Sequence, residues 1–137
     1  MDIQTHGKID RELCGEPVDM ADGYCQVRLK TTSVMVTDST GLVHGGFIFS
    51  AADYAAMLAI NHPNVVLGAA NVRFLKPVRA NETVMAEAKV SQADGKKKTV
   101  SVTVHRNKEK VFEGNFTCFV PARHVLDEEN KNNSTSS

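Results

Sequence analysis

The chain carries no excess of charge of either sign. Its 137 residues include 16 Lys and Arg against 16 Asp and Glu, so the formal net charge is zero. A protein that binds nucleic acid usually carries a basic surplus that neutralises phosphates, so this class is not favoured. The same balance leaves little long-range repulsion between copies of the chain.

Cysteines are few, and long apolar runs are missing. The three cysteines are odd in number and have no paired spacing, which argues against a disulfide framework or a zinc site. The five histidines show no metal-ligand spacing either, so we expect no metal. The longest apolar stretch, residues 47–60, is too short to cross a bilayer and contains Asp53. Because the first residues lack the basic and apolar regions of a signal peptide, we expect a cytoplasmic protein with no membrane partner.

The remaining composition fits one globular domain. Hydrophobic residues make up 42% of the chain and charged residues 23%, which is enough apolar material for a core. Residues 1–23 are polar and interrupted by Gly and Pro, and they predict a loosely packed arm. Residues 24–121 carry the regular patterns of the domain, and residues 122–137 predict a polar, flexible tail.

One helix and several strands are predicted within the domain. Alanine richness and a stop at residues 61–63 predict a helix that begins near Gly45 and is apolar almost all round. This order predicts an α+β fold, in which short turns join the strands of a curved antiparallel sheet around one central helix. One sheet cannot cover every side of that helix, so a second copy would have to cover the remainder. Alternation and turn residues predict strands over 24–30, 65–75, 83–90, 99–106 and 111–120, with 32–37 continuing or re-pairing the first.

Asp53 is the candidate catalytic residue on the predicted helix. It is the only group between Gly46 and Asn61 that ionises below pH 9, and its helical neighbours are apolar. An unpaired buried carboxylate costs several kcal/mol, so such a residue is paired, exposed at a cleft, or functional. An acid that faces water or caps a neighbouring backbone remains the open alternative.

Gly45 and Gly46 lie at the start of the same helix. Free backbone N–H groups at a helix start can bind a developing oxyanion, although a glycine-rich helix entry needs no ligand. Asp53 follows Gly46 by seven residues, which places it on nearly the same face but about 10 Å further along the axis. One carbonyl cannot contact both groups of one chain, so a cooperating pair would come from two chains.

Two segments resemble the hot-dog-fold acyl-CoA thioesterases of the phenylacetate-pathway type. They are residues 41–53, which contain His-Gly-Gly followed by an acid, and residues 71–77, Asn-Val-Arg-Phe-Leu-Lys-Pro. The similarity extends over about residues 24–121. It implies a five- or six-stranded antiparallel sheet around one helix, a homodimer or dimer of dimers, and hydrolysis of acyl-CoA to free acid and coenzyme A. It implies no cofactor beyond the coenzyme A of the substrate.

The resemblance assigns roles by position. Asp53 would match the catalytic carboxylate, acting as general base on water or as nucleophile. Gly45 would match the glycine whose amide polarises the thioester carbonyl, with Gly46 beside it. His44 would match the motif histidine, which supports the loop or the carbonyl, although a hydrogen-bonded helix-entry histidine is the open alternative.

Two positions depart from the family pattern and keep a rival function open. Asp38 stands where relatives often carry Asn, and an ionised carboxylate cannot donate to a carbonyl. Leu67 lies near the place where one branch has a Ser or Thr that orients water, although Ser50 could supply a hydroxyl one turn before Asp53. Both changes favour a non-catalytic acyl-CoA-binding or regulatory protein, whereas the intact motif favours the enzyme.

Several cations could hold the phosphates of coenzyme A. Lysines in a hairpin are also expected on any solvated turn, so this assignment has a plain alternative. The candidates are Lys76, Arg79, Lys97 and Arg106.

Overall fold

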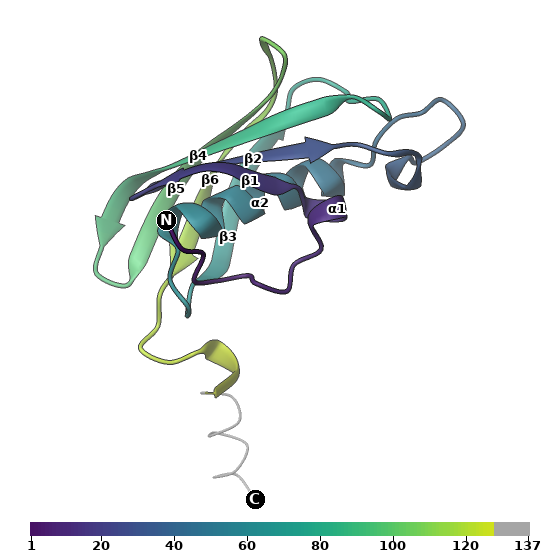
Figure 1. Cartoon of the computed structure of the whole chain (residues 1–137). Helices are drawn as coiled ribbons and strands as arrows, with labels where there is room; N and C mark the ends of the chain where they lie inside the picture. Colours follow the sequence, from purple (N-terminus) through teal and green to yellow (C-terminus); the bar gives the residue numbers. More distant parts are fainter. Residues whose placement is uncertain (128–137) are drawn as a thin grey trace, which may run out of the picture.

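The structure is a computed structural model that describes residues 1–127, so most of the predicted tail, residues 128–137, lies outside the described residues. A six-stranded antiparallel sheet curves around one long helix, α2, which confirms the predicted hot-dog fold (Figure 1). The elements in chain order are α1 (Arg11–Cys14), β1 (Glu16–Ala21), β2 (Tyr24–Lys30), the 3-10 turn η1 (Ser33–Met35), α2 (Gly45–Ile60), β3 (Val66–Phe74), β4 (Thr83–Asp94), β5 (Lys97–Arg106) and β6 (Glu109–Phe119).

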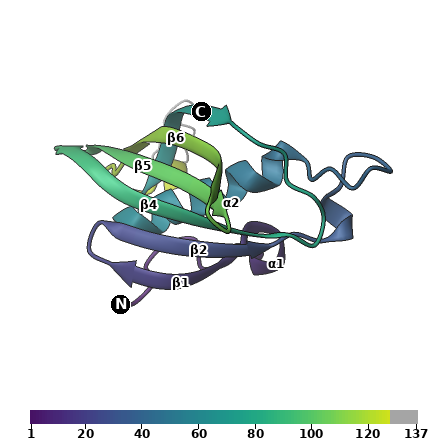
Figure 2. The same cartoon turned by 90° about the horizontal axis from the view of Figure 1, so that it is seen from above.

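The order of the strands across the sheet is β1-β2-β4-β5-β6-β3 (Figure 2). The β4–β5 and β5–β6 connections are hairpins, as predicted. The expected short turn between β3 and β4 is wrong, because β3 pairs with β6 at the far edge and β4 pairs with β2. Residues 75–82 therefore cross from one edge of the sheet to its middle. The predicted strand over 32–37 is replaced by η1 and a single bridge between Val36 and Val43.

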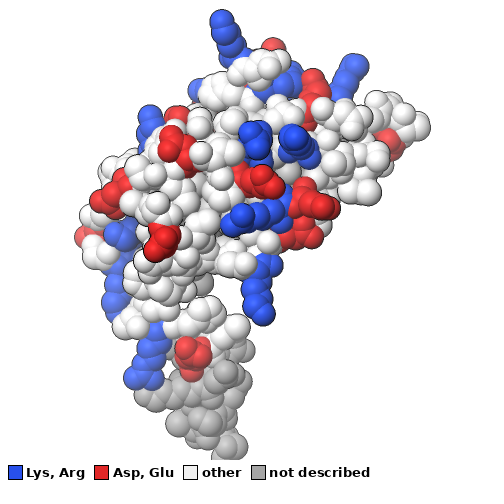
Figure 3. Space-filling view, in the orientation of Figure 1, with Lys and Arg blue, Asp and Glu red and all other residues white. Residues whose placement is uncertain are grey.

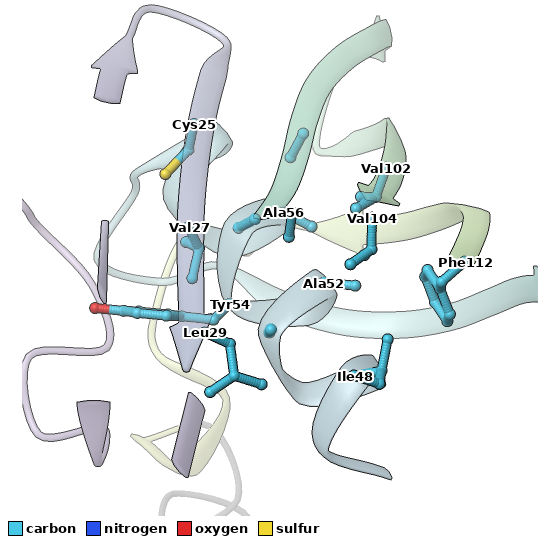
Figure 4. Packing of buried hydrophobic residues seen from close by; sticks show 14 of the residues in the cluster. Cys25, Val27, Leu29, Ile48, Ala52, Tyr54, Ala56, Val102, Val104 and Phe112 are labelled. Carbon is cyan, nitrogen blue, oxygen red and sulfur yellow. The ribbon is translucent and has the colours of Figure 1, made fainter. Parts of the chain in front are cut away.

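Helix α2 begins and ends where the sequence predicts. Its N-cap is His44, and its C-cap is Asn61, whose φ of 53° is left-handed and whose N–H donates to the Met57 carbonyl. Small residues let the helix lie close to the sheet, and Ala52 and Ala56 face Val102 and Val104 of β5 (Figure 4).

Residues 1–23 are more ordered than the predicted arm. Strand β1 pairs with β2 along its length, with a shift in register after Pro17 that weakens the period-two signal. Asn61 holds the first residues of the chain, which precede β1. Its Oδ1 accepts from the Gln4 N–H and its Nδ2 donates to the Asp2 carbonyl, both at 2.8 Å. Tyr54 on the outer side of α2 is only 1% exposed, and its ring lies 6.3 Å from that of His6. The chain's own N-terminal segment thus covers much of the helix that we expected a second copy to cover.

Charges of both signs are interleaved on the face shown in Figure 3, and no broad area of that face has one sign. Among residues 1–127, no helix is long and apolar enough to span a bilayer. Within the same residues, no group of three or more His, Cys, Asp and Glu side chains comes together as a metal site would require.

Candidate functional site

Asp53 lies in the middle of α2 and is half-buried. Its Oδ1 is enclosed and has no hydrogen-bond partner in the described part of the chain. Burial raises the pKa of this carboxyl from 3.8 to about 6, because desolvation disfavours the charged form. Among residues 1–127 the Asp53 side chain is therefore neither paired nor used as a cap, which leaves it available for chemistry.

The floor beneath Asp53 is made by β6 and the edge strand β3. The ring of Phe49 lies 5.4 Å from that of Phe116 on β6, and one helical turn further Asp53 lies over Cys118. The charge of Asp53 is close enough to contribute to the raised pKa of the Cys118 thiol, after burial. Leu67 is the cross-strand partner of Cys118, so both side chains face the helix. The surroundings of Asp53 are thus apolar, and Leu67 offers it no hydroxyl.

The start of α2 differs from the predicted pair of free amides. The Gly46 N–H donates to His44 Nδ1 at 2.7 Å, so this amide is already used. His44 is thus a hydrogen-bonded histidine that caps the helix, and a role for it toward a substrate stays a prediction. The Gly45 N–H has no partner within residues 1–127 and is the available donor.

Asp38 and Ser50 make local contacts. The Asp38 carboxylate accepts from the backbone N–H and the hydroxyl of Thr40, and these bonds hold the pKa of the exposed carboxyl below its usual value. The Ser50 hydroxyl lies 3.2 Å from the Cys14 thiol on α1. Neither side chain hydrogen-bonds to Asp53 within residues 1–127, so a role for Asp38 in the site stays a prediction.

The predicted phosphate-binding cations do not form one cluster. Arg106 donates to the Pro77 carbonyl at 2.6 Å and to the carboxylates of Glu82 and Glu109, so it ties the 75–82 connection to the β5–β6 hairpin. Lys76 lies 3.6 Å from Glu109. Lys97 begins the strand that Arg106 ends, which separates them by about 30 Å.

Among the four candidates, Arg79 is the cation near the start of α2 that has no ion-pair partner within residues 1–127. Its side chain is exposed and forms no ion pair within residues 1–127, while its backbone bridges Leu42. The other two candidates in this region, Lys76 and Arg106, are already paired with carboxylates.

Comparison with known proteins places this geometry in a family. The model of the family described as Thioesterase superfamily matches residues 40–113, which include the His44–Gly46 turn and Asp53. The chain belongs to the thioesterase superfamily. Among solved structures, a mutant of the phenylacetic acid degradation protein PaaI from Thermus thermophilus is 26% identical, with a TM-score of 0.74 over 81% of this chain and 97% of that one. The predicted resemblance to the phenylacetate type is thus confirmed.

Closer relatives carry other names. The uncharacterized protein PH1136 from Pyrococcus horikoshii is 50% identical, with a TM-score of 0.91 over 92% of this chain and 97% of that one. A protein named methylthioribose-1-phosphate isomerase from Aquifex aeolicus is 59% identical over 85% of this chain, but the match covers 25% of that protein. The transcription factor FapR from Staphylococcus aureus is 33% identical over 83% of this chain and 62% of its own length. This chain therefore spans only part of the curated relatives that it matches.

Sequence reasoning missed two neighbours of the site. The sequence shows Cys118 only as a lone thiol and Phe74 only as part of a motif. Their positions depend on β6 and β3 being neighbours, which no local pattern reveals. The one available signal was the apolar alternation of residues 111–120, which places Cys118 on the buried face together with Phe116.

Proposed function

We propose that this protein is an acyl-CoA thioesterase that hydrolyses a thioester to a free acid and coenzyme A. The observation that carries the proposal is the half-buried Asp53 carboxyl in a thioesterase-superfamily fold, whose Oδ1 has no hydrogen-bond partner within residues 1–127. Perturbed, unpaired acids of this kind cluster at functional sites. Coenzyme A enters as part of the substrate, and we propose no further cofactor.

Hydrolysis of a thioester needs a hydrogen-bond donor for the carbonyl oxygen and a general base for the attacking water. The Gly45 N–H donates to the thioester carbonyl oxygen, and the partial positive charge of the α2 N-terminus stabilises the oxyanion that develops there. Asp53 takes a proton from a water molecule as the water oxygen bonds to the carbonyl carbon. Collapse of the tetrahedral intermediate breaks the C–S bond, and the proton passes to the departing thiolate. Alternatively, the Asp53 carboxylate attacks the carbonyl carbon and the C–S bond breaks, so that coenzyme A leaves as the thiolate and takes a proton from water. A water molecule then hydrolyses the resulting mixed anhydride and restores the carboxylate.

The two groups must come from different chains. Gly45 and Asp53 lie about 12 Å apart along one helix axis, too far to act on one carbonyl. The outer edge of β3 pairs with no other strand among residues 1–127, and the chain carries no net charge that would oppose association. We therefore propose a homodimer joined at this edge, or a dimer of two such dimers, in which one chain's Asp53 approaches the partner's helix start.

Turnover of acyl-CoA thioesters is the direct test. The full chain is assayed with short, long and aromatic acyl-CoAs, together with Asp53→Asn and the exposed hairpin control Asp94→Asn. Asp53→Asn should lower kcat by at least about 100-fold, as expected for a lost general base, and Asp94→Asn should leave it unchanged. Because burial raises the pKa of Asp53 to about 6, the rate should also fall as the pH drops below this value. Equal turnover of the parent and Asp53→Asn proteins would reject the assignment.

A non-catalytic acyl-CoA-binding or regulatory protein is the second candidate. Leu67 and Cys118 give Asp53 an apolar floor with no hydroxyl to orient water, and the similarity to FapR adds a relative named as a transcription factor. This candidate predicts saturable acyl-CoA binding with no hydrolysis of any acyl-CoA tested. Hydrolysis that depends on Asp53 would exclude it.

A further inference from the structure

A groove of about 290 Å³ lies at the β1 side of the sheet, between α1, the adjoining ends of β1 and β2, and η1 (Figure 2). Among the described residues, none from α2 or β3 lines it, so the groove is separate from the Asp53 carboxyl and the Gly45 amide. Its volume lies near the lower limit for sites that hold small molecules, so its occupant is small.

The groove forms because β1 is shorter than the strand beside it. The first residue of β1, Glu16, pairs with Arg28, so within residues 1–127 the end of β2 has no strand on that side. The Thr31 N–H donates to the Glu82 carbonyl at 3.0 Å, on the β4 side. Because backbone groups alternate in direction along a strand, the N–H of Lys30 points to the opposite side, where the groove lies. The groove therefore has a backbone donor beside its cations.

Positive charge exceeds negative charge in the lining of the groove. Arg11, Arg28 and Lys30 contribute three cations against the two carboxylates of Glu12 and Glu16. Within residues 1–127, Arg28 pairs with Glu16 at 3.9 Å, whereas Arg11 and Lys30 form no ion pair. One unit of positive charge is left over, and a ligand with a single negative charge would balance it.

The rest of the wall is apolar. Val34 on η1 is 75% exposed, which is the highest value among the large hydrophobic side chains of residues 1–127, and Leu13 on α1 is 37% exposed. Exposed apolar side chains in a concave place mark a site for a ligand or a partner. An apolar group that covers them leaves water together with them, which is favourable.

The wall that α1 makes is anchored to the rest of the chain. The Asp10 carboxylate caps this helix by accepting from two backbone N–H groups, at 2.9 and 3.1 Å. The Cys14 thiol lies 3.2 Å from the Ser50 hydroxyl on α2. Burial raises the pKa of the Tyr54 phenol on α2, and Arg11 lies close enough to offset part of that rise. The cation and the apolar side chain that α1 presents are therefore held in place without a ligand.

We propose that this groove binds a small carboxylate with an apolar tail, the chemistry of a short- or medium-chain aliphatic acid. The carboxylate accepts from Arg28, from the Lys30 ammonium and from the Lys30 N–H, and the tail covers Leu13 and Val34. A planar carboxylate fits the fork of a guanidinium group, and its single charge equals the surplus in the lining. A phosphate monoester carries nearly two charges at neutral pH, which exceeds that surplus. The site does not depend on the proposed hydrolysis of thioesters.

NMR titration of the full chain tests the site. Backbone amide signals are followed at about pH 8 as hexanoate, acetate, hexanol and hexyl phosphate are added to separate samples. Hexanoate should shift the amide signals of Leu13, Lys30 and Val34 until they saturate. It should bind at least about tenfold more tightly than acetate, which lacks the tail, and about threefold more tightly than hexanol, which lacks the charge. Hexyl phosphate should bind no more tightly than hexanoate.

Two exposed substitutions separate the charged contact from the apolar one. Lys30→Gln should weaken the binding of hexanoate about threefold and leave that of hexanol unchanged. Val34→Ser should weaken the binding of both by about threefold. Lys108→Gln, an exposed lysine of the β5–β6 turn outside the groove lining, is the matched control and should change neither.

Four outcomes would overturn the site. Equal affinities for hexanoate and hexanol would mean that the cations do not contact the ligand. Tighter binding of hexyl phosphate would make this a phosphate site. Shifts of the Gly45 and Asp53 amides instead of those in the groove would place the acid at the proposed thioesterase centre. No shift with any compound, together with a Val34→Ser protein of lower mass in light scattering, would show that a second copy of the chain covers the groove.

The site and the proposed enzyme can fail independently. Asp53→Asn, which should abolish hydrolysis, should leave the affinity for hexanoate and the shifts of Leu13, Lys30 and Val34 unchanged. Saturable binding in the groove of a parent protein that hydrolyses no acyl-CoA would support the site and reject the hydrolase. Hydrolysis by a protein whose groove binds none of the four compounds would do the reverse.

Discussion

At the scale of single residues, Asp53 combines an apolar environment with a titratable group. Its pKa is raised from 3.8 to about 6 by burial. Between these two pH values the folded chain keeps a proton that the unfolded chain releases. Stability therefore decreases as the pH rises through this window, and the cost is complete above about pH 6.

The substitution Asp53→Asn removes that cost. We expect the variant to be more stable than the parent at pH 8 by on the order of 1–2 kcal/mol, less than the full shift implies because an amide is still buried. The advantage should shrink as the pH falls from about 6 to about 4. Urea unfolding of both proteins at pH 4, 6 and 8 measures it. A stability difference that does not vary with pH would mean that the carboxyl is ionised normally in the folded chain.

The substitution Asp38→Asn tests whether Asp38 approaches the thioester, which the structure of one chain does not decide. Asn at this position keeps an oxygen that can accept from Thr40, so the loop should retain its shape. If Asp38 approaches the thioester in the assembled protein, Asp38→Asn adds a donor and should raise turnover or shift its pH dependence to lower pH. Steady-state rates across pH 5–8 measure the effect. An unchanged profile would assign Asp38 to the loop turn alone.

At the scale of secondary-structure elements, the N-terminal segment completes the core. Its turn from α1 into β1 occurs at Gly15, whose φ is +101°. A Cβ there would lie 2.6 Å from Val27 Cγ1 and 2.9 Å from the Arg28 carbonyl oxygen. Only glycine lets the two elements approach β2 this closely.

Gly15→Ala should therefore detach β1 from the sheet. We expect a loss of about 2–4 kcal/mol in the free energy of unfolding, from backbone strain and overpacking together. Gly7→Ala is the matched control, because no atom lies within 4 Å of its added Cβ. Thermal melts measure stability, and hydrogen exchange at the β2 amides shows whether its edge opens. Equal stability of the two variants would contradict the close approach at Gly15.

At the scale of the whole molecule, the sheet and the N-terminal segment, residues 1–23, together bury all but one face of α2. The half-buried positions Phe49, Ser50 and Asp53 follow one face of the helix, while the neighbouring positions are buried in the chain. With Phe49 and Asp53 lying over β6, beside the open edge of β3, this face is where a second chain has most to contribute.

Mixing two inactive variants tests the shared site. Asp53→Asn removes the carboxyl, and Gly45→Pro removes the amide donor at a helix start whose backbone suits proline, since His44 is already extended. The Cβ of the new residue would lie 3.1 Å from Phe74 Cε1, so this ring must shift by a few tenths of an ångström and the folding of the variant is checked first. Heterodimers should regain activity, up to one intact site per dimer, and the regained rate should follow subunit exchange. A folded and active monomer, or no recovery after proven exchange, would reject the shared site.

The sequence by itself determined the elements whose signals are local. The boundaries of α2 follow from its cap residues and alanine content, and β2 follows from seven alternating residues. Asp53 could be singled out because an acid in an apolar helix is unusual wherever the helix lies. Residues His44–Gly46 could also be singled out, because they form a contiguous motif that is visible in the sequence alone.

Only the tertiary structure decided the relations between distant segments. Strand β3 joins β6 rather than β4, and this pairing brings Phe74 beside Gly45 and Cys118 beneath Asp53. The order of strands depends on which arrangement buries the most apolar surface with the fewest unpaired backbone groups. That balance is summed over the whole chain, so no short stretch of sequence contains it. The same global packing decides the place of residues 1–23, which the sequence predicts to be a loosely packed arm and which in the structure cover part of α2.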